Sequence, residues 1–330
     1  MNFREKRMSR PLVLMPGPMN RSVQEGLAEG FEVIRLWEAE NPDALLAERA
    51  RDIVGAAVGG TTVDAAFLDQ FPKLQIVSSF GVGYDKIDAT AAAERGVVVT
   101  NTPGVLDDEV ADTALGLLLM TARELPQAER YLRAGKWHER PYPLTPATLK
   151  GRRMGILGLG RIGEAIAHRA AAFGISVAYH NRRRKDVDFP YYESLVELAR
   201  DVDILTIVIP GGDGTRQLVN AEVLAALGPD GILINVARGT VVDEAALVDA
   251  LRSRTILAAG LDVFEHEPDV HPGLLELDNA VLLPHVGSAS VPTRDAMGRL
   301  VVENLVSWFG TGVPVTPVQE SADLVRRLGG

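Results

Sequence analysis

The chain has 330 residues, of which 46% are hydrophobic and 24% charged, and its 34 basic and 44 acidic residues leave a formal net charge of −10. This length suits two globular domains, and the acidic balance argues against nucleic acid or an anionic membrane as the main partner. The chain has no cysteine, which excludes disulfides, thiolate metal sites and cysteine nucleophiles. No apolar run approaches the roughly 20 residues that span a bilayer.

The N-terminal segment is basic and is followed by a short apolar stretch broken by prolines. A signal peptide needs a longer uninterrupted apolar core, so we expect a cytoplasmic protein. Translation could start at Met1 or at Met8.

Short apolar runs then alternate with helical patterns, which predicts parallel strands joined by crossover helices. This first α/β unit has no phosphate-binding glycine pattern after its first strand. Its predicted strands are residues 12–15, 31–36, 53–58, 74–79 and 97–100.

A break at 101–104 precedes one long predicted helix over 107–134, which could link two domains. Residues 135–150 are rich in proline and aromatic residues and are predicted to form an ordered arm. A second α/β unit starts at Gly151, and a helix over 292–309 and a tail follow it. The strands predicted in this second unit are 154–157, 175–179, 204–209, 232–236, 257–261 and 281–283.

The fold class predicted from these patterns is α/β, with two Rossmann-like, doubly wound parallel-sheet domains. If the end of the chain packs back on the first domain, that domain is discontinuous. We therefore expect a substrate domain at 1–104 plus 290–330. The dinucleotide-binding domain is expected at 105–289, including the long linking helix and a dimerisation arm.

A G-x-G-x-x-G pattern opens the second unit, between the strand at 154–157 and a helical pattern at 164–173. Gly158 permits the turn, Gly160 lets the backbone approach a pyrophosphate, and Gly163 lets the helix lie close to the strand. The helix N-terminus presents unpaired N–H groups to the phosphates. Glycine also punctuates many turns for structural reasons, but the surrounding strand, helix and strand favour dinucleotide binding.

The end of the next strand predicts which dinucleotide binds. NAD sites carry Asp or Glu there, about 20 residues on, to accept from the ribose 2′-hydroxyl. Here the position holds Asn181, followed by Arg182, Arg183, Arg184 and Lys185. Guanidinium groups can grip a 2′-phosphate that a carboxylate would repel, so we predict NADPH, with NADH as a weaker alternative. The other possibility is a solvated basic turn.

Three loops at the carboxyl ends of predicted strands carry reactive side chains: Arg238, Glu267 and His285. Ligands of doubly wound sheets bind beyond these strand ends. Each residue alone could be structural, but their shared edge beside a predicted dinucleotide favours catalysis. The remaining histidines lack such company and match no metal motif, so no metal is expected: His138, His168, His180, His266 and His271.

These groups suit reduction of a carbonyl. A ketone that accepts a hydride develops negative charge on oxygen, which needs a proton donor and a nearby cation. Histidine titrates near pH 6.5, so His285 could donate the proton. Glu267, bonded to the far ring nitrogen, would favour the imidazolium, and Arg238 would bind a substrate carboxylate.

At this point the chain resembles the D-isomer-specific 2-hydroxyacid dehydrogenase family, and within it the glyoxylate/hydroxypyruvate and hydroxyphenylpyruvate reductases. The resemblance runs from about Ser78 to Pro317 and is highly specific when its motifs are taken together. They are SSFGVGYDKID, NTPGVLDDEVADTALGLLL, GILGLGRIG, INVARGTVVDE, AGLDVFEHEP and LLPHVGSAS.

The resemblance implies that Arg238, Glu267 and His285 are catalytic, with His285 as the acid/base. It implies a substrate site at Arg238, Ser288 and the backbone N–H groups of Val82 and Gly83. Asp262 would contact the cofactor carboxamide. The full set of implied cofactor contacts is Thr113, Gly158, Leu159, Gly160, Arg161, Ile162, Gly163, Asn181, Arg182, Arg183, Ile209, Pro210, Val236, Ala237, Arg238, Asp262, His285 and Gly287.

Members of the family are usually homodimers in which the arm after the long helix crosses to the partner. Some reductases place a tryptophan of the arm in the neighbouring site, a position that Trp137 or Tyr142 would fill here. The sequence also carries no C-terminal regulatory domain of the kind found in many phosphoglycerate dehydrogenases, which counts against that activity.

We therefore predict an NADPH-dependent reductase that converts small 2-keto acids, glyoxylate and hydroxypyruvate first, to D-2-hydroxy acids. The enzymatic alternatives are reduction of an aryl pyruvate such as hydroxyphenylpyruvate, or of 2-ketogluconate. A non-enzymatic alternative is a cofactor-sensing binding protein, because transcriptional corepressors resemble the same family. No nucleic-acid or membrane partner is expected.

Overall fold

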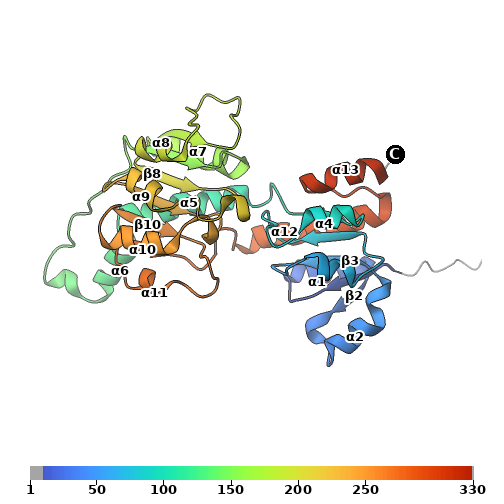
Figure 1. Ribbon diagram of the computed structural model, residues 1–330. Helices are drawn as coiled ribbons and strands as arrows, with labels where there is room; N and C mark the ends of the chain where they lie inside the picture. The colour runs from blue at the N-terminus through green and yellow to red at the C-terminus, as the bar shows by residue number, and fades with distance from the viewer. Residues whose placement is uncertain (1–9, 329–330) are drawn as a thin grey trace, which may run out of the picture. The chain divides into compact units, whose positions relative to one another are not determined.

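The computed structural model describes residues 10–328, which divide into two compact α/β units (Figure 1). The first unit contains residues 10–106 together with residues 291–328, and the second contains Asp107–Ser290. Met8, the alternative start, lies outside the described residues. The α/β fold class with a discontinuous N-terminal unit is confirmed.

The first unit is built on a five-stranded parallel sheet with the order β2-β1-β3-β4-β5. The residues of β1 alternate between two buried faces: Leu12 and Leu14 join one apolar cluster, while Val13 and Met15 join the other. All five predicted strands are confirmed, with ends shifted by at most two residues: β1 (Leu12–Met15), β2 (Glu32–Arg35), β3 (Ile53–Val58), β4 (Ile76–Ser79) and β5 (Val98–Thr100).

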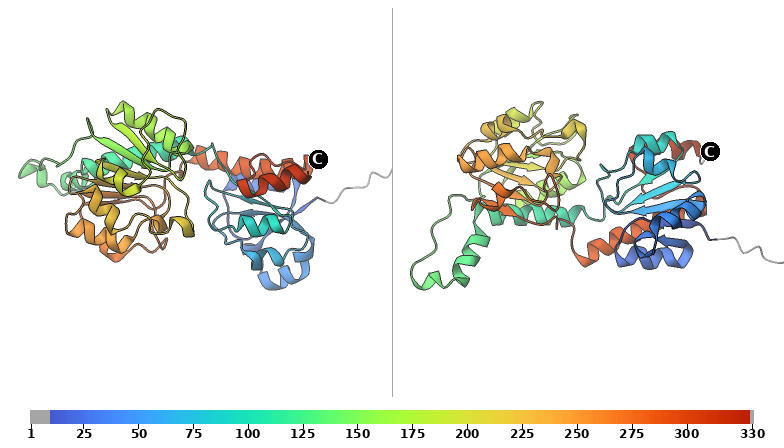
Figure 2. Two further views of the ribbon diagram at one scale, coloured as in Figure 1. Left: turned by 45° about the horizontal axis from the view of Figure 1, so that its top comes forward. Right: turned by 60° about the horizontal axis from the view of Figure 1, so that its bottom comes forward.

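Helices cover both faces of this sheet (Figures 1 and 2). One face is covered by α2 (Pro42–Arg49), α3 (Ala65–Asp69) and α4 (Ala89–Glu94), and the other by α1 (Arg21–Gly30) and α12 (Val291–Thr311). Because α12 comes from the far end of the chain, it makes the unit discontinuous. The segment after residue 309, predicted as a plain tail, contains the further helix α13 (Gln319–Leu328), which packs along β5.

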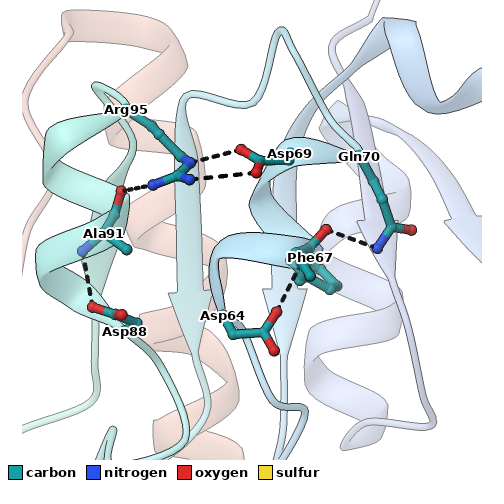
Figure 3. A network of polar contacts seen from close by, with 8 residues as sticks. Asp64, Phe67, Asp69, Gln70, Asp88, Ala91 and Arg95 are labelled. Atoms are coloured by element: carbon teal, nitrogen blue, oxygen red, sulfur yellow. Dashed lines mark hydrogen bonds and ion pairs between the residues drawn. The ribbon is translucent and has the colours of Figure 1, made fainter.

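Polar contacts fix the two short helices α3 and α4 on the first sheet (Figure 3). Asp64 and Asp88 cap their N-termini, each accepting a backbone N–H three residues further on at 2.8 Å. Arg95 donates to both carboxylate oxygens of Asp69, at 2.8 and 3.4 Å. The ion pair is exposed and stabilises only modestly, so the buried apolar face of each helix contributes most of its packing.

The second unit is built on a six-stranded parallel sheet with the order β11-β10-β9-β8-β6-β7. Since every pairing is parallel, all six carboxyl ends meet at one edge, and the strand order reverses between β6 and β8. The predicted strands are confirmed within two residues: β6 (Arg153–Leu157), β7 (Ser176–His180), β8 (Ile204–Ile207), β9 (Ile232–Asn235), β10 (Ala258–Leu261) and β11 (Ala280–Leu282).

Two layers of helices enclose this second sheet. On one face lie α5 (Asp107–Ala122) and α7 (Arg161–Ala172), and on the other lie α8 (Leu195–Arg200), α9 (Ala221–Leu227) and α10 (Glu244–Arg252), while the short α11 (Pro272–Leu275) precedes β11. Gly260 lets α5 approach β10 closely, because a Cβ there would lie 2.7 Å from Leu117. Helix α5 therefore packs directly on β10.

The prediction of one continuous helix over 107–134 is wrong. The chain turns at Glu124, whose φ is 50°, and a second helix, α6 (Leu125–Arg133), begins there with Pro126 in its first turn. Proline cannot donate the backbone bond that would continue α5. The arm that follows has only the short 3-10 turn η3 (Lys136–His138), and Figure 2 shows α6 and the arm, in green, standing away from the sheet of their own unit.

Within residues 10–328 no helix combines the length and the apolar character that crossing a membrane requires.

Candidate active site

His285 and Glu267 form a hydrogen-bonded pair at the carboxyl edge of the six-stranded sheet. His285 Nδ1 lies 2.7 Å from Glu267 Oε2, although the two residues are on the loops after β11 and β10. The side chains are 46% and 36% exposed, so a ligand can reach them. The other carboxylate oxygen of Glu267 accepts the Phe264 N–H at 3.1 Å, so both ends of the carboxylate are held.

This contact changes the acidity of Glu267. Burial alone would raise its pKa, but the hydrogen bonds from His285 and the Phe264 N–H, with the positive charges of His285 and Arg238, outweigh burial and hold the pKa below its usual value. Glu267 is therefore an anion that favours the protonated imidazole.

Asp262, the first residue after β10, anchors the loop that carries His285. Its two carboxylate oxygens accept the N–H groups of Val286 and Gly287 at 2.7 and 2.8 Å, and its carbonyl accepts the His285 N–H at 2.8 Å. His285 has φ of 53°, a region that a non-glycine residue adopts at some cost. Asp262 is 1% exposed, and burial raises its pKa although the two N–H bonds oppose the rise. These bonds hold His285 in its strained position.

Arg238 comes to the same edge on the loop after β9. The next residue, Gly239, packs directly on the Glu267 loop, because a Cβ there would lie 1.8 Å from the Phe264 carbonyl carbon. Only glycine permits that approach. Arg238 donates to the Ala237 carbonyl at 2.7 Å, and its charge contributes to the lowered pKa of Glu267. The three residues predicted to be catalytic are therefore brought together within one unit.

The glycine-rich turn after β6 leaves room for a phosphate. A Cβ at Gly163 would lie 2.4 Å from the Gly158 carbonyl oxygen, and Gly158 has φ of 104°, so both positions need glycine for the turn itself. Gly160 differs: it is exposed, and a Cβ there would meet nothing within 4 Å. Helix α7 starts after Gly160 without a side-chain cap, so its first N–H groups face this open space. These residues fit a pyrophosphate.

Asn181, at the ribose-sensing position, is tied to the glycine-rich turn. Its Oδ1 accepts the Leu159 N–H at 2.7 Å, an interaction that the sequence did not reveal. The guanidiniums of Arg182, Arg183 and Arg184 are exposed and make no ion pair with a carboxylate of the described chain. Three cations are thus presented beside the turn.

The basic turn is held in shape from beneath. The hydroxyl of the buried Tyr179 accepts the Lys185 N–H at 2.8 Å and donates to the Lys185 carbonyl at 3.1 Å. Tyr191 donates to the Asn181 carbonyl at 3.2 Å. Lys185 itself is paired with Glu164 of α7 and is the one cation of the cluster that is engaged. The turn therefore presents its arginines on a fixed backbone.

The remaining predicted cofactor residues of the second unit lie along the same carboxyl edge or beside it. Thr113 donates to the Gly287 carbonyl at 3.3 Å, and Arg161 pairs with Asp107 at 2.8 Å. A Cβ at Gly158 would touch Ile209 at 2.6 Å, which places Ile209 against the glycine-rich turn. The other predicted cofactor residues are Ile162 in the first turn of α7, Pro210 after β8, and Val236 and Ala237 after β9. Ser288, predicted to bind the substrate, follows Gly287.

Val82 and Gly83 belong to the first unit, on the loop after β4. Asn101 donates to the Val82 carbonyl at 2.7 Å, and Thr102 bonds Gly81 in both directions, at 2.9 and 3.1 Å. The N–H groups of Val82 and Gly83 donate to no other described residue. Their predicted role, binding a carboxylate, stays a prediction.

Sequence reasoning missed one buried acid near the site, Glu244 at the start of α10. Its Oε1 accepts the Glu265 N–H at 2.7 Å, inside the loop that carries Glu267. An acidic residue in a first helical turn signals only a helix start, so the pattern gave no hint of this contact. Within residues 10–328 no three His, Cys, Asp or Glu side chains form a metal-binding group.

Comparison with known proteins decides the family. The model of the D-isomer specific 2-hydroxyacid dehydrogenase, NAD binding domain, matches residues 115–287. The chain belongs to the D-isomer specific 2-hydroxyacid dehydrogenase family. The resemblance seen in the sequence is thus confirmed, and the matched span contains the glycine-rich turn, the basic turn and all three residues predicted to be catalytic.

Relatives within this dehydrogenase family carry the names of specific reductases. A hydroxyphenylpyruvate reductase of Plectranthus scutellarioides is 46% identical over 93% of this chain and 98% of its own length. A glyoxylate/hydroxypyruvate reductase A of Arabidopsis thaliana is 45% identical over 93% and 98%. The crystal structure of an NADPH-dependent glyoxylate/hydroxypyruvate reductase from Sinorhizobium meliloti, in complex with NADP and malonate, is 55% identical, with a TM-score of 0.90 and coverage of 95% and 98%.

Proposed function

We propose that this protein is an NADPH-dependent reductase of small 2-keto acids, with glyoxylate and hydroxypyruvate as its main substrates. Glyoxylate yields the achiral glycolate, and the larger 2-keto acids yield D-2-hydroxy acids. The observation that carries the proposal is the 2.7 Å contact between His285 Nδ1 and Glu267 Oε2, at the sheet edge that also carries the glycine-rich turn. The second unit is the dinucleotide-binding domain in this proposal, and the first is the substrate domain.

His285 is the proton donor. With Nδ1 bonded to Glu267, the second N–H of the imidazolium, at Nε2, is left for the oxygen of the substrate carbonyl. The Glu267 anion favours the protonated form of the ring and fixes its orientation. Arg238 supplies the positive charge that a 2-keto acid requires. It would bind the substrate carboxylate and stabilise the carbonyl oxygen, which becomes negative during reduction. When bound, the cofactor supplies the hydride.

The open cradle at Gly160 and the uncapped N-terminus of α7 would hold the pyrophosphate. Arg182 and Arg183 would bind the 2′-phosphate, which distinguishes NADPH from NADH. The similarity to the Sinorhizobium meliloti reductase with bound NADP supports this preference.

A substrate panel tests the function. NADPH absorbance is followed with purified protein and glyoxylate, hydroxypyruvate, phenylpyruvate or 2-ketogluconate, and we expect oxidation with the first two. His285→Gln should lower kcat by about 10² to 10⁴, the usual contribution of a general acid, while NADPH binding by fluorescence stays intact. His168→Gln, an exposed histidine of α7, is the matched control. Absence of NADPH oxidation with all four acids would refute the reductase and favour a cofactor-sensing binding protein.

Hydroxyphenylpyruvate is the second candidate substrate. The relative named for it is as similar to this chain, at 46% identity, as the glyoxylate/hydroxypyruvate reductase A, at 45%. A kcat/KM for an aryl pyruvate above that for glyoxylate would make the second candidate the better description of the enzyme.

We also propose that the protein works as a homodimer in the cytoplasm. Large apolar side chains stand exposed on α6 and the arm, including Leu132 at 56%, Trp137 at 66% and Leu144 at 99%, and a second copy would cover them. Tyr142 is turned to its own chain, where it donates to Glu124 at 3.0 Å, so Trp137 is the better candidate to reach a partner. Light scattering of the purified protein measures the oligomeric state, and a monomer at micromolar concentration would refute the dimer.

A further inference from the structure

The loop that carries Glu267 is held at two successive backbone N–H groups, those of Phe264 and Glu265. The Phe264 N–H donates to Glu267 Oε1 at 3.1 Å, and the Glu265 N–H donates to Glu244 Oε1 at 2.7 Å. The two N–H groups belong to successive residues and point to two different carboxylates. One carboxylate is that of Glu267 itself and the other comes from α10, so the loop lies between the reactive pair and a residue of the scaffold.

Glu244 is suited to hold this loop rigidly. It is 5% exposed, and its helix is fixed by the cap that Asp243 provides to the Ala246 N–H at 3.0 Å. Gly239 packs on the peptide that joins Phe264 and Glu265, because a Cβ added at Gly239 would lie 2.2 Å from the Glu265 nitrogen. A peptide that is both hydrogen-bonded and closely packed has little freedom to move.

The titratable groups that face Glu244 are Glu265, His271 and His266. Burial raises the pKa of Glu244, the Glu265 N–H opposes the rise, and among the charges Glu265 raises the pKa while the two histidines lower it. The Glu265 carboxylate has its own cation, Arg216. Among the described residues, Glu244 therefore bonds to the backbone of the Glu267 loop and pairs with no cation.

We propose that Glu244 is a positioning residue of the acid–base pair: its carboxylate fixes the Glu265 N–H, and thereby the adjoining residue Phe264, whose N–H orients Glu267 toward His285. The proposal rests on the proposed function, in which His285 donates the proton. Glu244 touches neither substrate nor cofactor in this role. Without its acceptor, the Glu265 N–H would turn toward water, the 264–267 loop would loosen, and the contact between Glu267 and His285 would lengthen.

The test compares three substitutions. Glu244→Asp keeps the charge but withdraws the oxygen by about 1.5 Å, one carbon–carbon bond. Glu244→Gln keeps the acceptor at the same reach without the charge, and Glu244→Ala removes it. We expect kcat for glyoxylate reduction to fall about tenfold in the Asp and Ala variants, as for the loss of one orienting hydrogen bond, and to stay within about threefold in the Gln variant. The dissociation constant of NADPH should not change.

The pH profile separates positioning from a general structural role. Reduction needs protonated His285, so the rate falls on the alkaline side, and a weaker Glu267 contact moves that fall to lower pH. We expect a shift of about 0.5 to 1 pH unit in Glu244→Asp, none in Glu244→Gln, and no further shift when Glu244→Asp is combined with Glu267→Gln. Glu222→Asp, an exposed acid in the first turn of α9, is the matched control.

The outcomes distinguish this proposal from the proposed function. If the unsubstituted enzyme reduces no 2-keto acid, or if Glu267→Gln alone leaves the profile in place, the acid–base assignment fails. If Glu267→Gln shifts the profile but Glu244→Asp does not, or shifts it equally in both backgrounds, positioning by Glu244 is refuted and the proposed function stands. Should the Ala variant fail to fold, the Asp and Gln variants carry the test.

Discussion

Replacement of both Arg182 and Arg183 by alanine should weaken the use of NADPH and leave that of NADH nearly unchanged. Both guanidiniums are exposed and pair with no described carboxylate. A hydrogen bond to a charged group contributes about 1.5 to 3 kcal/mol, and solvent exposure places each arginine at the lower end of this range. Two arginines then contribute about 3 kcal/mol, or a roughly 100-fold rise in the NADPH Michaelis constant.

The measurement is the initial rate of glyoxylate reduction over a range of each cofactor concentration. NADH carries a hydroxyl where NADPH carries the phosphate, so its Michaelis constant should change less than about threefold, within the effect of an ordinary surface substitution. The preference for NADPH over NADH should also shrink as the salt concentration rises, because the electrostatic screening length falls from about 10 Å at 0.1 M salt to about 3 Å at 1 M. Arg200→Ala, an exposed arginine of α8, is the control. Equal changes for both cofactors would show that the turn is only a solvated surface.

Three further outcomes are expected. Glu267→Gln should move the alkaline fall in kcat/KM to lower pH by about one unit. The reason is that losing a contact of about 1.4 kcal/mol with the His285 imidazolium corresponds to one pH unit. An unchanged pH profile would contradict the pairing of Glu267 with His285. Gly163→Ala should lower the free energy of unfolding by about 1 to 3 kcal/mol in a denaturant titration, because the alanine Cβ would overlap backbone atoms. Gly160→Ser should instead leave the free energy of unfolding within about 0.5 kcal/mol and raise the cofactor Michaelis constant. Equal losses of stability in the two variants would refute this difference. Burial, aided by the Glu320 carboxylate of α13, raises the pKa of Tyr84 to about 12, above its value in the unfolded chain. The free energy of unfolding should therefore decline between pH 10 and 12. The same decline in a Tyr84→Phe variant would exclude this tyrosine as the cause.

The strands could be predicted from the sequence because each is a short apolar run buried on both faces, such as Ile53–Val58. The break after α5 had a visible signal in Pro126, but the apolar pattern continues past it and masked the turn at Glu124. The helix α13 was missed because, among its described residues, the buried apolar ones are few: Leu324 and Val325. Local patterns thus predicted the sheets well and the chain between them less well.

The common edge of Arg238, Glu267 and His285 followed from one physical rule, that parallel strands end on the same side of a sheet. The contacts that fix these side chains followed from no such rule. Glu244 and Glu265 are 21 positions apart, and no periodicity relates a first helical turn to a loop peptide. The sequence therefore predicted which groups meet but not what holds them in place.

Solvent exposure separates the acid–base pair from the two acids that hold its loops, and this difference bears on how such a site can evolve. His285 and Glu267 are partly exposed, whereas Asp262 and Glu244 are buried, at 1% and 5% exposure, and bind backbone N–H groups. A buried carboxylate is costly unless it is hydrogen-bonded, and here its partners are peptide groups that every residue except proline supplies. The positions of the loops are thus independent of most of their side chains. Substrate preference can change through those side chains while the buried acids keep the proton donor where the chemistry requires it.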